Sequence, residues 1–381
     1  MNAGTEPSGP DSTAATPSDP GQLSASPAEE ALARSGGRPT ADDMLPPVEP
    51  PSAGFLVQLF LVPGVIVAII VGVWLTFHWL AHLGNDPQAY LRTLRRDSEG
   101  RWQAALNFAN DLRGPGGETL KADATLATEV GNVLNDEVAK GRTNEQSQRL
   151  KLYLCRALGE FAVPEAVPPL VSRAADLTDL ETARAAVEAL AVLTTNLAVA
   201  GQIAADPQQV VEVVVAASKS DDKQLRGSAA FTLGIVGGEA AVEQGAVQQL
   251  VMLQSDASED VRYNAATALA RLGRDEAYET LAEMLALEDV DAGPDEQSQS
   301  ERYKRALVVV NALRAVALLV DATGASPPDG IVARVEELKD DPVSDVKAAA
   351  SAVVERIQRE ASASVGSGWR LDRRIATTVG Q

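Results

Sequence analysis

Two histidines and one cysteine are the residues of this chain best suited to metal binding or nucleophilic chemistry. His78 and His82 are four positions apart, so on a helix they share one face and could bind a metal ion or a haem iron. The motif His-Glu-x-x-His is absent, because Trp79 stands in place of the glutamate, and no third ligand lies nearby in the sequence. We therefore expect a histidine pair with nothing bound, and neither a metal site nor a cofactor.

Cys155 is the other candidate for chemistry. It lies in the apolar run LYLCRAL, where burial would keep the thiol protonated and unreactive. As the only cysteine, it excludes an internal disulfide and any multi-cysteine metal site. The sequence contains no phosphate-binding loop, dinucleotide fingerprint or nucleophile elbow. It therefore predicts no catalytic residue and a protein that is not an enzyme.

An acidic segment at residues 288–301 begins like a calcium-binding loop, with Asp289 and Asp291 at the first and third positions. The rest of the pattern fails: Pro294 occupies the sixth position, which requires glycine, and Ser300 the twelfth, which requires a bidentate glutamate. We expect a solvated loop between helices, whose length makes it a candidate contact site for a partner.

Charge and composition narrow the classes of function. The 381 residues contain 33 Lys and Arg against 53 Asp and Glu, a net charge of −20. This charge argues against nucleic-acid binding, which needs clustered basic residues, and favours protein partners that carry a basic patch. Hydrophobic residues form 45% of the chain and aromatic residues 4%, which predicts a core of small aliphatic side chains. The excess of Arg over Lys is typical of a GC-rich, bacterial genome.

Residues 1–54 have the composition of a disordered tail. They contain ten prolines, eight acidic and two basic residues, and almost no large apolar side chain. Such a segment cannot bury enough apolar surface to offset the entropy of ordering it. A docking tail for an SH3-like partner is the alternative, but no basic residue flanks a Pro-x-x-Pro core. We therefore predict a flexible acidic linker.

Residues 55–83 form a run without a single Asp, Glu, Lys or Arg. A helix of this length could extend about 43 Å, more than the roughly 30 Å of a bilayer's hydrocarbon core. A cleaved signal peptide is disfavoured, because the run is too long, begins late and lacks a small-x-small cleavage site. A buried soluble helix is disfavoured, because the run is apolar on all faces. The sequence thus predicts one transmembrane helix in contact with the lipid bilayer.

The basic residues near this segment predict its orientation. Arg38 is the only one within about 20 residues on the N-terminal side. Four arginines follow on the C-terminal side: Arg92, Arg95, Arg96 and Arg101. The positive-inside rule therefore predicts a single-pass protein of the cell membrane with residues 84–381 in the cytoplasm.

Residues 84–360 alternate between helical patterns rich in Ala, Leu and Val and short loops, with apolar residues recurring every three or four positions. Two segments align residue by residue: DKQLRGSAAFTLGIVG at 222–237 and SEDVRYNAATALARLG at 258–273. Weaker copies surround Arg149, Arg184 and Lys347, and the period is near 40 residues. Helical repeats of this length indicate helix pairs stacked in an α-solenoid.

The shared pattern, Asp-x-x-x-Arg-x-x-Ala-Ala-x-x-Leu-x-x-hydrophobic-Gly, resembles HEAT repeats, especially the short type named after the phycobilisome lyases. The resemblance covers roughly residues 87–360 and implies an all-α solenoid of antiparallel helix pairs. It is nearly silent on function, because HEAT arrays mostly bind other proteins. Some relatives act in bilin attachment, so a lyase or cofactor chaperone is the rival function.

The repeated positions have expected structural roles. We expect close helix packing at four alanines: Ala229, Ala230, Ala265 and Ala266. We expect a left-handed residue that closes a helix at three glycines: Gly159, Gly237 and Gly273. Asp222 and Ser258 precede the second helices of their copies and are expected to cap them.

Arg226, Arg262 and Lys347 occupy the same position in their copies. We expect them to form a structural ladder, paired with acidic loop residues of the adjacent repeat such as Asp221 or Glu259. The alternative is a basic strip that contacts an acidic partner.

The sequence therefore predicts four segments: a tail at 1–54, a transmembrane helix at 55–83, a HEAT-like solenoid at 84–360 and a flexible basic tail at 361–381. The predicted function is a membrane-tethered, non-catalytic scaffold whose concave surface binds another protein. Tethering would raise the partner's effective concentration at the membrane. A purely architectural element of an envelope complex is a further alternative.

Overall fold

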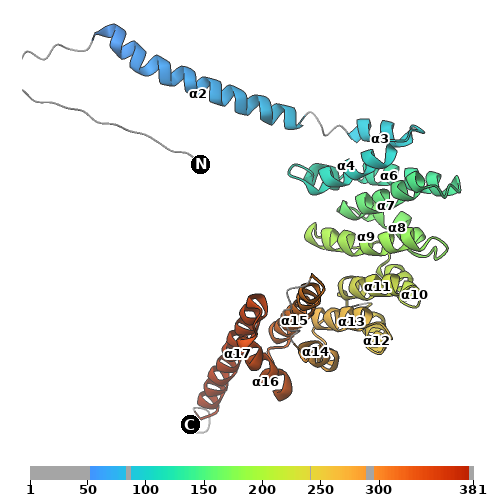
Figure 1. Ribbon diagram of the computed structural model, residues 1–381, viewed down its shortest axis with the longest axis vertical. Helices are drawn as coiled ribbons and strands as arrows, with labels where there is room; N and C mark the ends of the chain where they lie inside the picture. The colour runs from blue at the N-terminus through green and yellow to red at the C-terminus, as the bar shows by residue number, and fades with distance from the viewer. Residues whose placement is uncertain (1–51, 83–86, 241, 289–295, 377–381) are drawn as a thin grey trace, which may run out of the picture. The chain divides into compact units, whose positions relative to one another are not determined.

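A computed structural model describes residues 52–82, 87–240, 242–288 and 296–376 (Figure 1). The chain divides into two compact units, residues 1–82 and residues 83–381. The described residues are helical throughout, apart from turns and short connections, and contain no strand. The prediction of an all-α fold is confirmed.

The first unit contains one long helix, α2 (Ala53–His82). The hydroxyl oxygen of Ser52 accepts a hydrogen bond from the backbone N–H of Phe55, at 3.2 Å, and so caps the first turn. The large apolar side chains of α2 are exposed wherever the structure describes them, Phe60 by 74%, for example. Residues Val57–Phe77 are long and apolar enough to cross a membrane, and none of them is buried. Residues 1–51 of the predicted tail lie outside the described residues. The side chains of His78 and His82 lie outside them too.

The second unit is a stack of helices. Its α-helices and 3₁₀ turns, in chain order, are α3 (Pro87–Arg95), α4 (Arg101–Arg113), α5 (Glu118–Lys121), α6 (Ala124–Ala139), α7 (Glu145–Glu160), η2 (Pro164–Ala166), α8 (Val167–Ala174), α9 (Leu180–Val199), α10 (Pro207–Ala217), α11 (Lys223–Val236), α12 (Glu243–Leu253), α13 (Glu259–Arg271), η3 (Asp275–Ala277), α14 (Tyr278–Leu285), α15 (Glu296–Thr323), α16 (Asp329–Glu337), η4 (Leu338–Asp340) and α17 (Ser344–Ala376).

These helices form two rows. Helices α4, α7, α9, α11, α13, α15 and α17 contact one another in succession and are called the inner row here. The outer row consists of α6, α8, α10 and α12, which contact one another in succession. Further along the stack it continues with α14 and α16, which also contact each other. Within this unit the stack bends toward the inner row (Figure 1). This arrangement is an α-solenoid, as the repeat spacing predicts.

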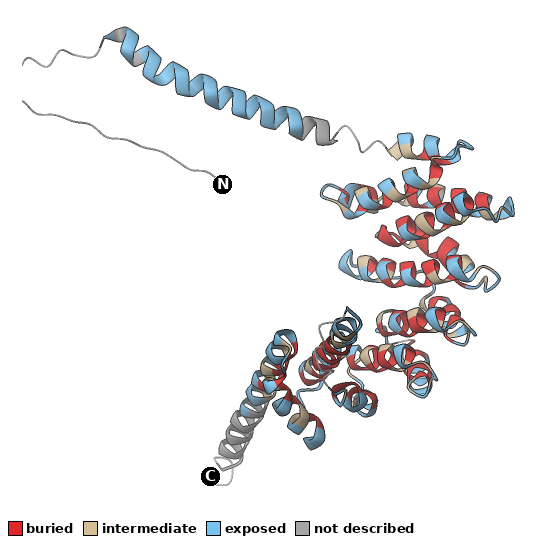
Figure 2. Cartoon of the chain, in the orientation of Figure 1, coloured by how far each residue is buried: buried red, intermediate tan, exposed pale blue. Residues whose placement is uncertain are grey.

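The core lies between the two rows and between successive inner helices, and runs through the whole stack (Figure 2). The four repeat alanines at positions 229, 230, 265 and 266 are fully buried, and so are Leu233 and Leu269. Small side chains at the helix contacts bring neighbouring backbones close together, while the leucines fill the space between the rows. This confirms the predicted roles of the repeated Ala and Leu positions.

Only one of the three repeat glycines closes a helix in the left-handed conformation. Gly273 has a φ of +69°, but Gly237 has a φ of −78° and Gly159 lies inside α7. A methyl group on Gly237 would come within 2.4 Å of the Cβ of Ala246, and one on Gly159 within 3.0 Å of Ala189. The prediction is therefore wrong for Gly159 and Gly237, because close packing requires glycine there.

The two predicted helix caps also differ. The Asp222 carboxylate accepts a hydrogen bond from the backbone N–H of Leu225 at 2.7 Å, as expected. The Ser258 side chain makes no capping bond to α13, and its own N–H donates to the Asp256 carboxylate at 2.8 Å. Asp256 therefore organises this turn, and the prediction for Ser258 is wrong.

The difference between the caps predicts unequal effects of alanine substitution. Asp222→Ala should lower the free energy of unfolding by about 1 kcal/mol, because one N–H at the start of α11 loses its partner. Ser258→Ala should change it by less than about 0.5 kcal/mol. Chemical denaturation of the two variants, followed by circular dichroism, measures both values. Equal losses would contradict the cap assignment.

Two boundaries differ from the sequence expectation. Residues 296–301 of the expected acidic loop form the first turns of α15, and residues 289–295 lie outside the described residues. The backbone of α17 is helical to Ala376, whereas the sequence predicts a flexible tail from residue 361. Helix α15 is also long and apolar enough to span a membrane, but 44% of its apolar window is buried in the stack.

Candidate functional site

The ladder residues contact other parts of the stack. Arg226 donates to both carboxylate oxygens of Asp256, at 2.7 and 2.9 Å, and to the carbonyls of Ser220 and Asp221, each at 3.0 Å. This guanidinium holds the pKa of Asp256 below its usual range. Asp256 precedes α13, so the bidentate pair joins successive repeats. Asp221 contributes its backbone carbonyl to this contact.

Arg262 makes the equivalent contact one repeat further along the stack. Its Nη2 lies 2.5 Å from Glu283 on α14, and its Nη1 donates to the carbonyl of Asp256 at 3.0 Å. Glu283 is thus the acidic partner, and Glu259 is not. Lys347 is exposed on α17, and the structure gives it no side-chain partner among the described residues. The side chains of Arg226 and Arg262 are thus bonded to residues of the stack. The structure does not bring Arg226, Arg262 and Lys347 together as one basic patch.

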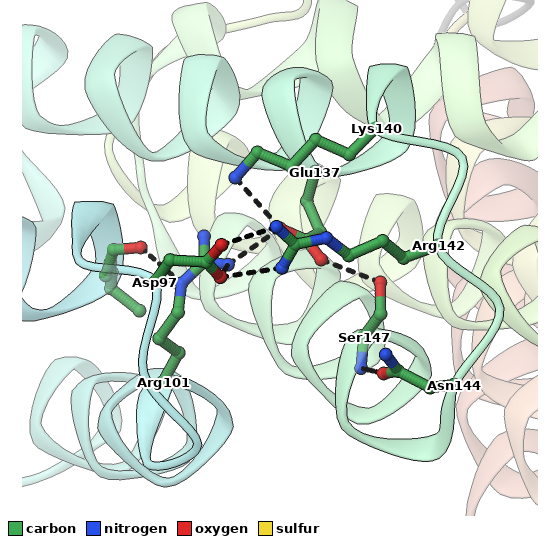
Figure 3. A network of polar contacts seen from close by, with 8 residues as sticks. Asp97, Arg101, Glu137, Lys140, Arg142, Asn144 and Ser147 are labelled. Atoms are coloured by element: carbon green, nitrogen blue, oxygen red, sulfur yellow. Dashed lines mark hydrogen bonds and ion pairs between the residues drawn. The ribbon is translucent and has the colours of Figure 1, made fainter.

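A buried polar network that the sequence analysis did not identify joins α3, α4, α6 and α7 (Figure 3). Arg101 contacts Glu137 at 2.7 Å, and both side chains are almost fully buried. Arg101 also donates to the carbonyl of Leu94 at 2.7 Å, and Ser147 donates to Glu137 at 2.8 Å. Burial raises the pKa of Glu137, but the bonds from Ser147 and Arg101 outweigh it and lower the pKa. The lowered pKa keeps this carboxylate ionised at neutral pH, and its bonds to Arg101 and Ser147 hold helices of the stack together.

Two further ion pairs, one buried and one half-buried, have the same character. Arg305 and Asp341 are 2.6 Å apart with both side chains buried. Lys151 pairs with Asp179; burial raises the pKa of Asp179, but hydrogen bonds from Lys151, Gln148 and Thr182 bring it down to about 2. A signal for these pairs does exist in the sequence. Lys151 and Arg305 are basic residues within otherwise apolar helix faces, which is where buried charges need a partner.

Cys155 is fully buried in α7, and burial raises the pKa of its thiol to about 12. The thiol therefore stays protonated at neutral pH and cannot act as a nucleophile. Among the described residues, no group of three or more His, Cys, Asp or Glu side chains could hold a metal ion.

The inner row presents an exposed stripe of side chains. On the inner helices this stripe is made of exposed and half-buried positions three or four residues apart, because the other faces pack on both neighbours and on the outer row. The exposed positions of α9 include Glu181, Glu188, Val192 and Thr195, and those of α11 and α13 include Gln224, Phe231, Asp260 and Arg271. The stripe crosses the stack from helix to helix and combines apolar, aromatic and charged side chains.

The centre of this stripe is hollowed around Phe231. A cavity of about 460 Å³ is lined by residues of α9, α11 and α13, among them Glu188 and Asn264. Phe231 is 46% exposed, and the guanidinium of Arg271 lies 6.0 Å from the centre of its ring. Ser228 donates to Glu188 at 2.8 Å, which holds this carboxylate at the cavity wall. An exposed aromatic ring in a polar frame is a common anchor point for a protein partner.

A second aromatic group lies at the N-terminal end of the stack. The rings of Trp102 on α4 and Tyr153 on α7 stack at 6.0 Å between centroids. Arg149 lies over the Trp102 ring at 5.1 Å, and Arg156 over the Tyr153 ring at 5.4 Å. Both rings are half-buried and already covered by arginines, so they offer less free apolar surface than Phe231 does.

A groove with a volume of about 900 Å³ lies between α15 and α17, the last two inner helices. Tyr303 and Leu307 of α15 line it and are 67% and 43% exposed. The α17 side is lined by Asp345, Arg356 and a run of small residues: Ala348, Ala349 and Ala352. The groove was not expected from the sequence, because α15 was not predicted to lie beside α17.

Comparison with known proteins agrees with the fold. Residues 210–292 match the family model for HEAT repeats, which confirms the resemblance for the part of the stack that contains both aligned segments. No curated protein matches the chain.

Several solved structures share the helical stack at low similarity. An engineered protein is 19% identical, with 72% of this chain and 98% of that chain covered and a TM-score of 0.31. Human deoxyhypusine hydroxylase in complex with glycerol is 19% identical, with coverages of 72% and 96% and a TM-score of 0.29. Computationally designed armadillo repeat proteins for modular peptide recognition are 19% identical, with coverages of 71% and 98% and a TM-score of 0.32.

Proposed function

We propose that this chain is a non-catalytic scaffold, held at the cell membrane by α2, whose HEAT-type stack binds another protein through its inner row. The observation that carries the proposal is the exposed stripe of the inner helices, with Phe231 at its centre and the groove between α15 and α17 at its end. Exposed aromatic and aliphatic side chains framed by charges are typical of protein-binding surfaces. Binding at the membrane would raise the local concentration of the partner.

The membrane part of the proposal is supported by α2 alone. The large apolar side chains of its described residues are exposed, and residues Val57–Phe77 are long enough to cross the hydrocarbon core. Arg92, Arg95 and Arg96 follow the helix, so the positive-inside rule favours a cytoplasmic location for the stack. The lyase or cofactor chaperone has no comparable support, since the described residues offer it no reactive thiol.

The proposal is tested with a photo-crosslinking amino acid placed in the full-length protein in intact cells. At Phe231, on the inner row, it should capture a discrete set of proteins. At Met252, which is 60% exposed on the outer helix α12, it should capture far less of that set. Equal capture at both positions, or none at Phe231, would contradict a binding role of the inner row.

The same cells test the tether and its orientation. The full-length protein should sediment with membranes, and a chain of residues 83–381 should not. Protease added outside spheroplasts should remove the N-terminal tail and leave the stack intact. Digestion of the stack under these conditions would contradict the proposed orientation. A full-length protein that stays in the soluble fraction would contradict the proposed membrane anchor.

A further inference from the structure

The groove between α15 and α17 has an apolar floor and a rim of arginines. The floor includes Leu307, Val310 and Leu313 of α15 and Val353 of α17. Arg302 and Arg314 of α15 and Arg356 of α17 also line the groove. Among the described residues that line the groove, Asp345 is the one that is acidic, and Asp321 lies 3.2 Å from Arg356 just outside. The lining therefore carries more positive than negative charge in a chain whose net charge is −20.

We propose that this groove is the docking site for an acidic amphipathic helix of a partner protein. The inference rests on the proposed function and deepens it by naming the chemistry of the partner. Charge complementarity acts over a Debye length of about 8 Å at physiological ionic strength, so the charges at the groove decide recognition there more than the charge of the whole chain does. Arg314 is exposed and has no ion pair among the described residues, which leaves its guanidinium available to a partner carboxylate.

A helix fits the groove better than an extended peptide does. An extended segment would bring unpaired backbone N–H and C=O groups onto a floor made of Leu, Val and Ala side chains, which cannot satisfy them. A helix satisfies its backbone internally and offers only side chains. The small residues Ala348, Ala349 and Ala352 let its backbone approach α17 closely.

The length of the groove sets the length of the helix. The lining residues of α15 run from Gln299 to Ala317, which corresponds to about 27 Å along a helix. A partner helix of about 18 residues would fill it, with apolar residues at i, i+3, i+4 and i+7 facing the floor and acidic residues on both flanks.

Neither the N-terminal tail nor the described helices of the chain offer an equivalent helix. Its N-terminal tail is acidic, but ten prolines and the scarcity of large apolar residues are incompatible with an amphipathic helix of that length. Helix α2 has no acidic residue, and the apolar faces of the described helices of the stack are buried in its core. The proposal therefore commits to a helix of a different protein as the occupant.

The test uses full-length protein in phosphatidylcholine nanodiscs, with empty discs as the blank. The probes are two fluorescent synthetic helices of about 18 residues with the same leucine pattern, one with Glu on its flanks and one with Lys. We expect the Glu helix to bind at least about tenfold more tightly, and its binding to weaken as salt is raised. Equal binding of the two, or tighter binding of the Lys helix, would overturn the proposal.

Substitutions locate the binding in the groove. Arg314→Glu and the exposed Ala352→Trp should each weaken binding of the Glu helix by about tenfold or more, by reversing a charge and by filling the groove. Lys304→Glu is the matched control, because Lys304 is exposed on the same helix but does not line the groove. It should change the affinity by less than about twofold. Equal effects of Lys304→Glu and Arg314→Glu would overturn the proposal.

Two other occupants would be recognised in the same experiments. A dimer that dissociates on Ala352→Trp would assign the groove to a second copy of the chain, and tighter peptide binding after deletion of residues 1–51 would assign it to the tail. Either result overturns the proposal. A photo-crosslinking amino acid at Leu307 distinguishes this proposal from the proposed scaffold function. Capture of proteins from Phe231 but not from Leu307 would contradict the docking site in the groove and leave the scaffold function supported. No capture from either position would contradict the scaffold function as well.

Discussion

Replacing Glu137 with Ala is expected to cost about 3–5 kcal/mol, because it leaves the buried guanidinium of Arg101 with only the exposed carboxylate of Asp97, at 3.8 Å, as a counter-charge. Glu137 joins α4, α6 and α7 through Arg101 and Ser147 (Figure 3). In a repeat stack each helix pair contacts only its neighbours, so the loss should be local. Hydrogen exchange should accelerate in α4, α6 and α7 while α13 to α17 stay protected.

The matched control is an exposed pair of the same residue types. Glu145 and Arg149 form an ion pair on the surface of α7, with the Glu145 side chain 76% exposed. Glu145→Ala should cost no more than about 1 kcal/mol. Similar losses for Glu137→Ala and Glu145→Ala would show that burial does not set the strength of the Arg101 contact.

The same network predicts a dependence on pH. The pKa of Glu137 is lowered in the folded protein, so its contribution to stability is complete above the ordinary glutamate pKa of about 4.3. That contribution is lost as the pH falls through the lower folded value. The stability gap between the wild type and Glu137→Gln should therefore narrow below about pH 4 in denaturation series at several pH values. A gap that widens on acidification would contradict this assignment.

Gly234→Ala is expected to destabilise the centre of the stack by about 1–3 kcal/mol. A methyl group at Gly234 in α11 would lie 2.6 Å from the Cβ and 2.7 Å from the Cα of Ala268 in α13. The second of these atoms is backbone, so the contact can be relieved only if the two helices move apart. Gly234 follows Phe231 by three residues on α11, so the partner binding that we propose for the inner row should weaken as well.

Gly245→Ala is the control for this substitution. Gly245 also lies inside a helix, α12, but a methyl group there would meet no atom within 4 Å. Alanine at this position should stabilise the protein by about 0.5–1 kcal/mol, because it reduces the backbone freedom of the unfolded chain. Thermal denaturation of both variants should thus give shifts of opposite sign. A stabilising Gly234→Ala would refute the close approach of α11 and α13.

The net charge of the chain does not predict the charge of each surface on it. The net charge of −20 predicts partners with a basic patch, yet the groove between α15 and α17 is lined by three arginines and one aspartate. Composition sums charges wherever they lie, whereas a partner contacts one surface. Which arginines gather there depends on helices that are distant in the sequence.

Local patterns in the sequence determined the helical fold and much of its repeat structure. Apolar residues at three- and four-residue spacing, together with the Ala-Ala and Leu positions of 222–237 and 258–273, predicted stacked helix pairs, because a helix must bury its apolar face against a neighbour. Cys155 was correctly placed in the core for the same reason. The Asp222 cap was predictable too, because a cap depends on residues only three positions apart.

Only the tertiary structure decided which residues meet across the stack. Arg226 pairs with Asp256 and Arg262 with Glu283, where sequence neighbours had suggested Asp221 and Glu259. Gly159 and Gly237 are required by packing against Ala189 and Ala246, residues that a local pattern cannot identify. The Arg101–Glu137 network and the α15–α17 groove arise in the same way. Each depends on the distance and rotation between helices that lie far apart in the chain, and these are set by the packing of the whole core.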